Sequence, residues 1–179
     1  MWSELDTPAG RLIAVTTAHG VAALGFDDDG SVLTQAERTH AAVARRDDLP
    51  LAGLRCEVEA YFAGELRAFS CVPDLATIDG FTRRVLDEAR RIPFGTVASY
   101  GELAARAGSP RAQRAAGSAM ARNPVQLLVP CHRVLPADGS LGGYSGREDR
   151  KAFLLDHEAA VLERDGSHGV FPGSRRSDG

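Results

Sequence analysis

Residues 99–134 read SYGELAARAGSPRAQRAAGSAMARNPVQLLVPCHRV, and this stretch decides the fold of the second half of the chain. Ser99 and Glu102 have the spacing of a capping box, in which each side chain binds the other residue's backbone amide at the start of a helix. Apolar residues then continue to about Ala107. We therefore expect a short helix between these positions.

A tight turn and a second helix are predicted to follow. Gly108 can make the turn, and Ser109 can cap the next helix with Pro110 in its first position. This second helix would run to Ala121 and carries several arginines among small residues. Two short helices joined in this way have the spacing of a helix–turn–helix, which occurs in DNA-binding proteins and at ordinary helix corners. Small residues suit a DNA groove and equally suit tight packing against another helix.

The segment after the second helix contains a candidate reactive group. Cys131 lies between a proline and a histidine, after residues 127–129, which we expect to form a buried strand. A cysteine becomes a nucleophile when its thiol loses a proton, and His132 and Arg133 could favour that thiolate. The alternative is that Cys131 is a small buried residue without reactivity.

The rest of the chain predicts an α+β fold. Residues 12–17 and 21–26 have the pattern of a hairpin and would form a small antiparallel sheet. Helices are expected at residues 34–45 and 51–62, a strand at 66–72, a linker at 73–80, and a helix from Phe81 that must stop at Pro93.

Charge is distributed unevenly along the 179 residues. Residues 1–80 contain 13 acidic residues and 6 arginines, whereas residues 81–160 contain 8 acidic and 12 basic residues. The basic half could meet a polyanion such as nucleic acid, or the imbalance could be a surface property without function. A hydrophobic content of 44% indicates a globular protein and excludes disorder as its main state.

Composition also bounds the compartment and the cofactors. No apolar run approaches the length of a membrane span and the N-terminus lacks a signal-peptide pattern, so we expect a cytoplasmic protein. Three cysteines without CxxC spacing predict neither a disulfide framework nor a zinc site, and we expect no cofactor. Cys56 in a helical pattern and Cys71 in a strand are expected to be packing residues.

Residues 130–134, PCHRV, resemble the active-site motif of the alkylguanine-DNA alkyltransferases, the methylated-DNA-protein-cysteine methyltransferases that repair 6-O-methylguanine. Order and spacing fit this family across the whole second half, and the first half matches loosely. Further matching positions are residues 61–62, 92–95, 99–100, 103–104, 107–108, 114–115, 120, 123–125, 143–146, 154–155 and 157–158. The resemblance implies an N-terminal mixed α/β domain (1–76) and a mostly helical winged helix–turn–helix domain (77–163). The remaining residues, 164–179, are rich in Gly, Ser and Arg and are expected to form a disordered tail.

The resemblance implies a reaction that each molecule performs once. Cys131 would attack the alkyl carbon and keep the alkyl group as a thioether, His132 would deprotonate it through a water, and Glu158 would hold the histidine. A buried histidine–carboxylate pair would stabilise imidazolium. Asn123 would tie the active-site turn to the helix–turn–helix, and Tyr100 would turn the flipped nucleotide and protonate the leaving guanine.

The resemblance also implies that the target base leaves the duplex before it reacts. Arg114 would fill the gap, and the second helix would lie in the minor groove of double-stranded DNA. The other expected DNA-binding residues are Ala115, Ser118, Arg122 and Arg133. The expected pocket for the alkylguanine is lined by Met120, Val134, Tyr144, Ser145 and Gly146. We expect a monomer that can bind DNA cooperatively, can also act on 4-O-methylthymine and has no membrane partner.

A second class of function is a non-catalytic, winged-helix DNA-binding protein that recognises lesions or regulates transcription. Such a protein would not need Cys131, His132, Asn123 and Glu158 together, so the complete set favours the alkyltransferase. A papain-like hydrolase fits less well, because its histidine is not adjacent to the nucleophile. Some relatives bind zinc in the N-terminal domain, but the cysteines and histidines of residues 1–80 lack a ligand spacing here, so we expect no metal.

Overall fold

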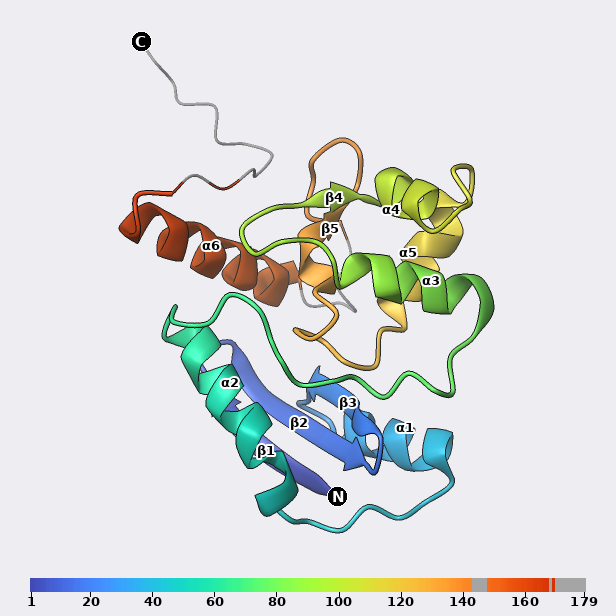
Figure 1. Cartoon of the computed structure of the whole chain (residues 1–179), viewed down its shortest axis with the longest axis vertical. Helices are drawn as coiled ribbons and strands as arrows, with labels where there is room; N and C mark the ends of the chain where they lie inside the picture. The colour runs from blue at the N-terminus through green and yellow to red at the C-terminus, as the bar shows by residue number, and fades with distance from the viewer. Residues whose placement is uncertain (143–147, 168, 170–179) are drawn as a thin grey trace.

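A three-stranded antiparallel sheet forms the core of the N-terminal domain (Figure 1). The computed structural model describes residues 1–142, 148–167 and 169, and its sheet consists of β1 (Trp2–Thr7), β2 (Gly10–Thr17) and β3 (Gly20–Phe26) in sequence order. The predicted hairpin is confirmed as β2 and β3. The first strand, β1, was not predicted and pairs with β2 along its whole length.

Two helices cover opposite faces of this sheet. α1 (Ser31–His40) packs with Ile13, Val15 and Ala23, whereas α2 (Ala52–Phe62) packs on the face that carries the alternate residues of β2. This division follows the two-residue period of a strand. The helix predicted at residues 34–45 is wrong at its end, because Ala41 adopts a left-handed conformation (φ 48°) that stops α1.

Short backbone segments occupy both edges of the sheet. Trp2 of β1 forms a bridge with Arg46, and Val21 of β3 accepts and donates hydrogen bonds with residues 72–74. Farther along β3, the Leu24 amide donates to the Pro124 carbonyl (2.8 Å), and the Leu24 carbonyl accepts from the Gln126 amide (2.6 Å). The strand predicted at residues 66–72 is wrong, since these residues form no strand and only an isolated bridge follows them, at Pro73.

The second domain is mostly helical. It contains α3 (Gly80–Ala89), α4 (Tyr100–Arg106), α5 (Gln113–Ala121) and α6 (Glu148–Arg164), with a two-residue parallel pair of β4 (Ala98–Ser99) and β5 (Val134–Leu135). The capping box is confirmed: Ser99 Oγ accepts from the Glu102 amide and the Glu102 carboxylate accepts from the Ser99 amide. It begins α4, which packs against α5 as the first half of the helix–turn–helix.

Two local predictions in this domain are wrong. Ser109 and Pro110 do not begin α5, because the Ala112 amide donates to the Ser109 carbonyl in a turn and the helix starts at Gln113 without a side-chain cap. Residues 127–129 form turns instead of a strand, and Leu127 has a positive φ of 68°. The chain therefore reverses sharply just before Cys131.

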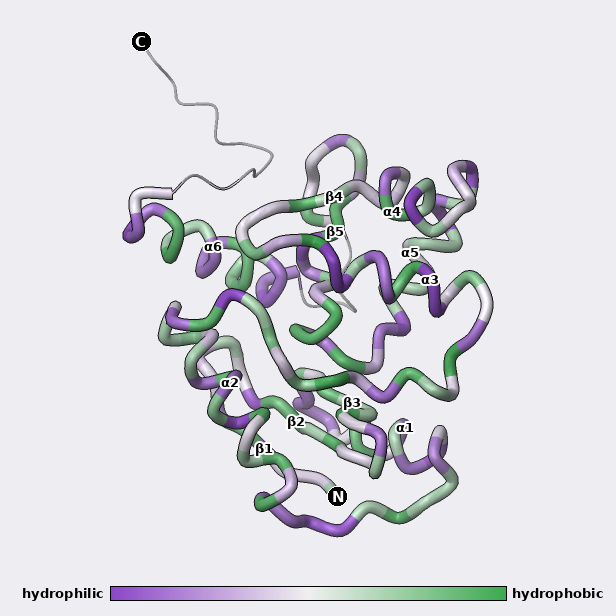
Figure 2. The backbone as a smooth tube through the Cα atoms, in the orientation of Figure 1, coloured by the Kyte–Doolittle hydropathy of each residue, from purple (hydrophilic) through white to green (hydrophobic). Residues whose placement is uncertain are grey.

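The buried core runs through both domains. Figure 2 shows hydrophobic stretches along β2 and β3 and an alternation of hydrophobic and hydrophilic residues along α3. Cys71 is half-buried against this core, but Cys56 is exposed on α2, so its predicted packing role is wrong. No helix in the described ranges is long and apolar enough to cross a membrane.

The predicted domain boundary at residues 76 and 77 falls in the irregular segment between α2 and α3. The last helix, α6, ends at Arg164, where the predicted tail begins. Most of that tail, residues 168 and 170–179, lies outside the described residues.

Candidate active site

Cys131 opens a short 3-10 turn (Cys131–Arg133) and is only 6% exposed. Asn123, at the end of α5, fixes the approach to this turn. Its side-chain amide donates to the Val129 carbonyl (2.8 Å), and its side-chain oxygen accepts from the Val125 amide (3.1 Å). The structure thus brings the helix–turn–helix and the cysteine together through one buried asparagine.

The carboxylate of Glu158, on α6, is the centre of a buried polar cluster. It is fully buried and lies 2.9 Å from His132 Nε2, as the sequence predicted. It also accepts from the Tyr61 hydroxyl (2.9 Å) and from the Gly95 amide (2.8 Å). Three segments far apart in the sequence therefore contact one carboxylate on α6.

Arg133 completes this cluster and is not at a DNA-facing surface. Its guanidinium donates to both oxygens of Glu158, with Nη2 at 2.8 Å, and to the Ile92 carbonyl (2.8 Å). Because its side chain is 7% exposed, the expectation that Arg133 contacts DNA is wrong. Burial by itself would raise the pKa of Glu158, but the His132 hydrogen bond and the charges of His132 and Arg133 lower it to about 2.

The charge on Arg133 changes the expected state of His132. Burial lowers the pKa of His132, and although Glu158 opposes this effect, Arg133 and Lys151 reinforce it. Glu158 thus favours the imidazolium form of His132, as the resemblance implies, whereas burial, Arg133 and Lys151 oppose it. Nε2 faces Glu158, and Nδ1 is buried without a hydrogen-bond partner among the described residues. Nδ1 of His132 is thus available to accept a proton.

Lys151 is a site residue that sequence reasoning missed. It lies on α6, is fully buried, and its ammonium donates to the Val134 carbonyl (2.8 Å), next to the Cys131 turn. Burial lowers the pKa of Lys151 to about 8, and a negative charge on Cys131 opposes this shift. A positive group thus lies within electrostatic reach of the cysteine. The only signal was that Lys151 is the single lysine in an arginine-rich chain.

Gly95 supplies an amide to the cluster, a role that the sequence did not predict. Its φ of 72° favours glycine, and an added Cβ would lie 2.0 Å from the Leu162 side chain. Tyr61, at the end of α2, was likewise not identified as a partner of Glu158. This contact could be predicted only from the packing of α2 against α6, which the sequence does not show.

Of the residues expected to contact the alkylguanine, Tyr100, Met120 and Val134 belong to the described structure and pack in or against the core cluster that includes Cys131. Tyr100 is half-buried, and burial together with the Cys131 charge raises its pKa. Met120 and Val134 are buried in the core. The remaining expected pocket residues, Tyr144, Ser145 and Gly146, lie outside the described residues.

The outer face of α5 carries the other expected DNA contacts. Arg114, Ala115 and Ser118 are exposed on one helix face, and Ser118 Oγ donates to the Arg114 carbonyl (3.1 Å). Arg122 is exposed just after the helix. This surface suits an approach to a polyanion, because its small residues permit close contact and its arginines supply charge.

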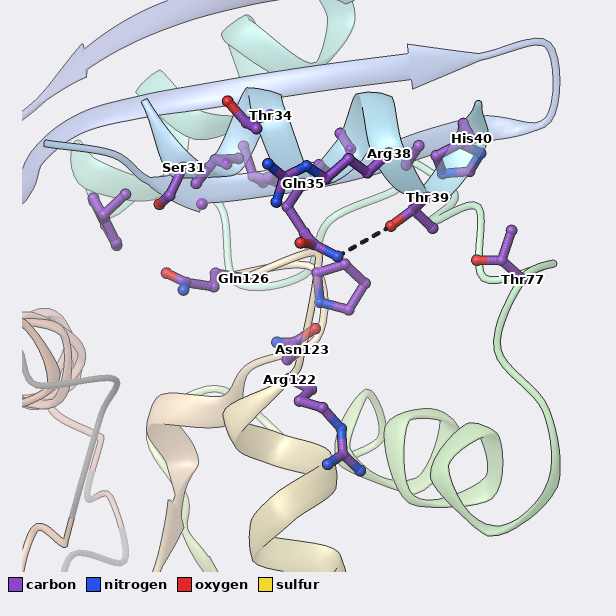
Figure 3. A pocket seen from close by; sticks show the side chains of 18 of the residues that line it. Ser31, Thr34, Gln35, Arg38, Thr39, His40, Thr77, Arg122, Asn123 and Gln126 are labelled. Atoms are coloured by element: carbon purple, nitrogen blue, oxygen red, sulfur yellow. Dashed lines mark hydrogen bonds between the residues drawn. The ribbon is translucent and has the colours of Figure 1, made fainter. Parts of the chain in front are cut away.

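A separate groove of about 1000 Å³ lies between α1 and residues 121–126. Figure 3 shows Gln35, Arg38 and Thr39 on α1, on one side of the groove. Arg122, Asn123 and Gln126 lie on the other side. Its lining carries both signs of charge, so it lacks the character of a phosphate site. In the described part of the chain, no three histidine, cysteine or acidic side chains are grouped to hold a metal ion.

A buried cysteine lies beside a histidine that contacts a buried carboxylate, and one asparagine joins this turn to a helix–turn–helix. This arrangement indicates a DNA-binding protein with a reactive thiol. Comparison with known families makes this class specific. Residues 1–74 match the ribonuclease-like domain of 6-O-methylguanine DNA methyltransferase, and residues 80–160 match its DNA-binding domain. The chain belongs to the 6-O-methylguanine DNA methyltransferase family. Its activity is DNA repair by transfer of an alkyl group from methylated DNA to a protein cysteine.

Relatives cover nearly the whole chain. The methylated-DNA–protein-cysteine methyltransferase of Mycobacterium leprae is 40% identical over 161 residues, which are 87% of this chain and 90% of the relative. The Haemophilus influenzae enzyme of the same name is 33% identical over 96% of this chain and 93% of its own.

Solved structures share the two-domain fold. The crystal structure of the Mycobacterium tuberculosis O6-methylguanine methyltransferase is similar with a TM-score of 0.75 at 35% identity, covering 89% of this chain and 93% of the other. A second structure of that protein, in complex with DNA, is similar to the same extent.

Proposed function

We propose that Cys131 is the alkyl acceptor and that Glu158, His132 and Asn123 prepare it for the reaction. The observation that carries this proposal is the distance of 2.9 Å between His132 Nε2 and the buried Glu158 carboxylate, which leaves His132 Nδ1 for the adjacent cysteine. The proton of the Cys131 thiol moves to Nδ1, directly or through a water. Lys151 then lies near the resulting thiolate and favours it.

The chemical step is an in-line displacement at the alkyl carbon. A carbon–sulfur bond forms as the bond between the alkyl carbon and guanine O6 breaks, and the electron pair of that bond leaves with guanine. Tyr100, half-buried near Cys131, donates a proton to the leaving guanine. The product is a thioether, which no group of the described site can hydrolyse, so each molecule acts once.

DNA reaches this site through the exposed face of α5. Guanine O6 faces the paired cytosine inside the stack, so the base must be extruded before Cys131 can reach the alkyl carbon. Arg114 fills the gap from the minor groove, Ala115 and Ser118 allow close approach, and Arg122 contacts phosphate; the exposure of all four residues supports these roles. Arg133 is not assigned to this surface, because it belongs to the Glu158 cluster.

The experiment that tests this function is mass spectrometry of the intact protein after incubation with duplex DNA that contains 6-O-methylguanine. We expect the mass of one methyl group on Cys131 and no further reaction. Cys131→Ala should abolish transfer and keep DNA binding, whereas Cys56→Ala should transfer normally. Repeated turnover, or a methyl group on Cys56 or Cys71, would overturn the proposal.

The same assay addresses the range of the reaction. We infer that 4-O-methylthymine is a slower substrate, because its alkylated oxygen occupies the same edge of the base as that of 6-O-methylguanine. The protein would act as a monomer in the cytoplasm, and its binding isotherm on long duplexes would show whether neighbouring molecules cooperate.

A further inference from the structure

Arg150, in the first turn of α6, makes an unusually complete set of contacts with the N-terminal domain. Its Nη2 donates to both carboxylate oxygens of Asp28 (2.8 Å each), and its Nε donates to the Ala9 carbonyl (3.1 Å). The guanidinium also lies 5.0 Å above the centre of the Phe26 ring. The Arg150 side chain is 11% exposed, whereas the Asp28 side chain is 38% exposed, so solvent reaches this ion pair from the Asp28 side.

These partners come from two loops of the sheet. Ala9 lies in the turn between β1 and β2, and Asp28 follows the end of β3. Gly10 has a φ of 117°, and an added Cβ there would lie 3.1 Å from Arg150 Nη2. The turn is therefore shaped to admit the guanidinium closely.

The next residue along α6 points into the active site. Lys151 is fully buried and donates to the Val134 carbonyl beside the Cys131 turn. Burial lowers the pKa of Lys151, so its ammonium would gain solvation by leaving this position. The first turn of a helix lacks intrahelical partners for its amides and frays readily unless something holds it. The contacts of Arg150 hold this particular turn.

We propose that Arg150 is a positioning residue, which clamps the first turn of α6 to the N-terminal domain and thereby keeps Lys151 beside Cys131. The N-terminal domain then contributes to the reactivity of the cysteine without touching substrate. This inference rests on the proposed role of Cys131 as acceptor.

Two readouts separate this role from a merely structural one. The first is the single-turnover rate of alkyl transfer from duplex DNA, and the second is the pH at which Cys131 becomes reactive toward iodoacetamide. Lys151 from α6, Tyr100 from α4 and His132 in the same turn are the titratable groups that face or adjoin the cysteine. Loss of a nearby positive charge raises the pKa of a thiol, so displacement of Lys151 should move this reactivity to higher pH.

We expect Arg150→Ala to slow transfer about tenfold and to shift the iodoacetamide profile upward, as loss of a supporting contact behind a reactive group commonly does. Asp28→Asn and the milder Arg150→Lys should shift both readouts in the same direction by less. The matched control is the Arg67–Asp165 ion pair, which joins the other end of α6 to the segment after α2. Arg67→Ala and Asp165→Asn should leave both readouts unchanged.

The decisive comparison uses Lys151→Met as a background. If Arg150 acts through Lys151, adding Arg150→Ala to Lys151→Met should produce no further upward shift. The proposal is overturned if Arg150→Ala lowers only the melting temperature, or if its upward shift persists in the Lys151→Met background. A wild-type protein that carries the alkyl group elsewhere than Cys131 would instead contradict the proposed function itself.

Discussion

Arginine performs opposite tasks in the Glu158 cluster and on the surface of α5. Arg133 is buried and donates its hydrogen bonds to Glu158 and to the Ile92 carbonyl. Arg114 is exposed, and among the described residues its guanidinium has no ion pair or hydrogen bond. Different arginines therefore serve the two tasks: a buried one supports the site of the thiol, and an exposed one is available to DNA. A buried charge is fixed by internal partners, whereas a surface charge remains available to a duplex.

The largest expected effect comes from breaking the buried cluster. Arg133→Ala would leave the Glu158 carboxylate buried without its main positive partner, a change that typically costs about 3–5 kcal/mol of stability. Chemical denaturation should measure this loss. Arg114→Ala is the matched control on α5 and should change stability by less than about 0.5 kcal/mol. Equal losses for the two variants would contradict the separation.

A second prediction concerns acid. The pKa of Glu158 is about 2 in the folded protein and near 4.5 when the chain is unfolded, so the unfolded state binds more protons between these values. The ionised carboxylate therefore stabilises the fold above about pH 4.5, and this contribution, about 3 kcal/mol, is lost as the pH falls toward 2.

Glu158→Gln should remove that part of the acid dependence. Denaturation of both proteins across this pH range isolates it, because the other carboxylates are common to the two. Parallel stability curves would mean that Glu158 titrates normally, in conflict with its burial among donors.

A third prediction addresses the exposed arginine. Arg114→Ala should slow repair of duplex DNA at least about tenfold, since extrusion of a base costs a few kcal/mol and the variant cannot fill the gap. A free alkylguanine base needs no extrusion, so its reaction with Cys131 should be nearly unchanged. Single-turnover rates on both substrates provide the measurement.

Glu158→Gln is the opposite control for this experiment. It alters the support of His132 and should slow duplex and free base alike. If Arg114→Ala also slows both substrates equally, Arg114 supports the fold of the site and its role at the gap is excluded.

The smallest effect is expected from salt. Arg122→Ala should weaken DNA binding uniformly and reduce the slope of log affinity against log salt by about 1, as expected for one lost phosphate contact. Arg38→Ala removes the same charge from α1, on the other side of the groove in Figure 3, and should leave the slope unchanged. Fluorescence anisotropy at several salt concentrations distinguishes the two.

Local signals were sufficient for part of this fold. The capping box at Ser99 and the β2–β3 hairpin depend on neighbouring residues, and both were predicted. The first strand, WSELDT, was not predicted because its buried positions are not all apolar. Ser3 is fully buried, and its hydroxyl donates a hydrogen bond to Asp48. A polar residue is buried here because a distant partner satisfies it.

The site shows the same limit. Cys131, His132, Glu158 and Asn123 were identified by resemblance to a family motif, and the structure brings them together. Lys151 and the true partner of Arg133 could not be predicted, since both depend on how α6 packs against segments that precede it by many residues. Sequence spacing does not show that His132 and Arg133, which are adjacent in the chain, both contact the same buried carboxylate.

The segment at residues 124–126, which covers part of the β3 edge, has a further consequence. It belongs to the domain that carries Cys131. Part of the edge of the N-terminal sheet is therefore covered by backbone hydrogen bonds from the other domain. If the two domains separate, Leu24 loses these partners, and the outer edge of β3 is left unpaired at this point, where a second molecule can add a strand. Aggregation should therefore begin when the domains separate, before either domain unfolds. The time for which the protein stays soluble then depends on how often the contact between Leu24 and residues 124–126 opens.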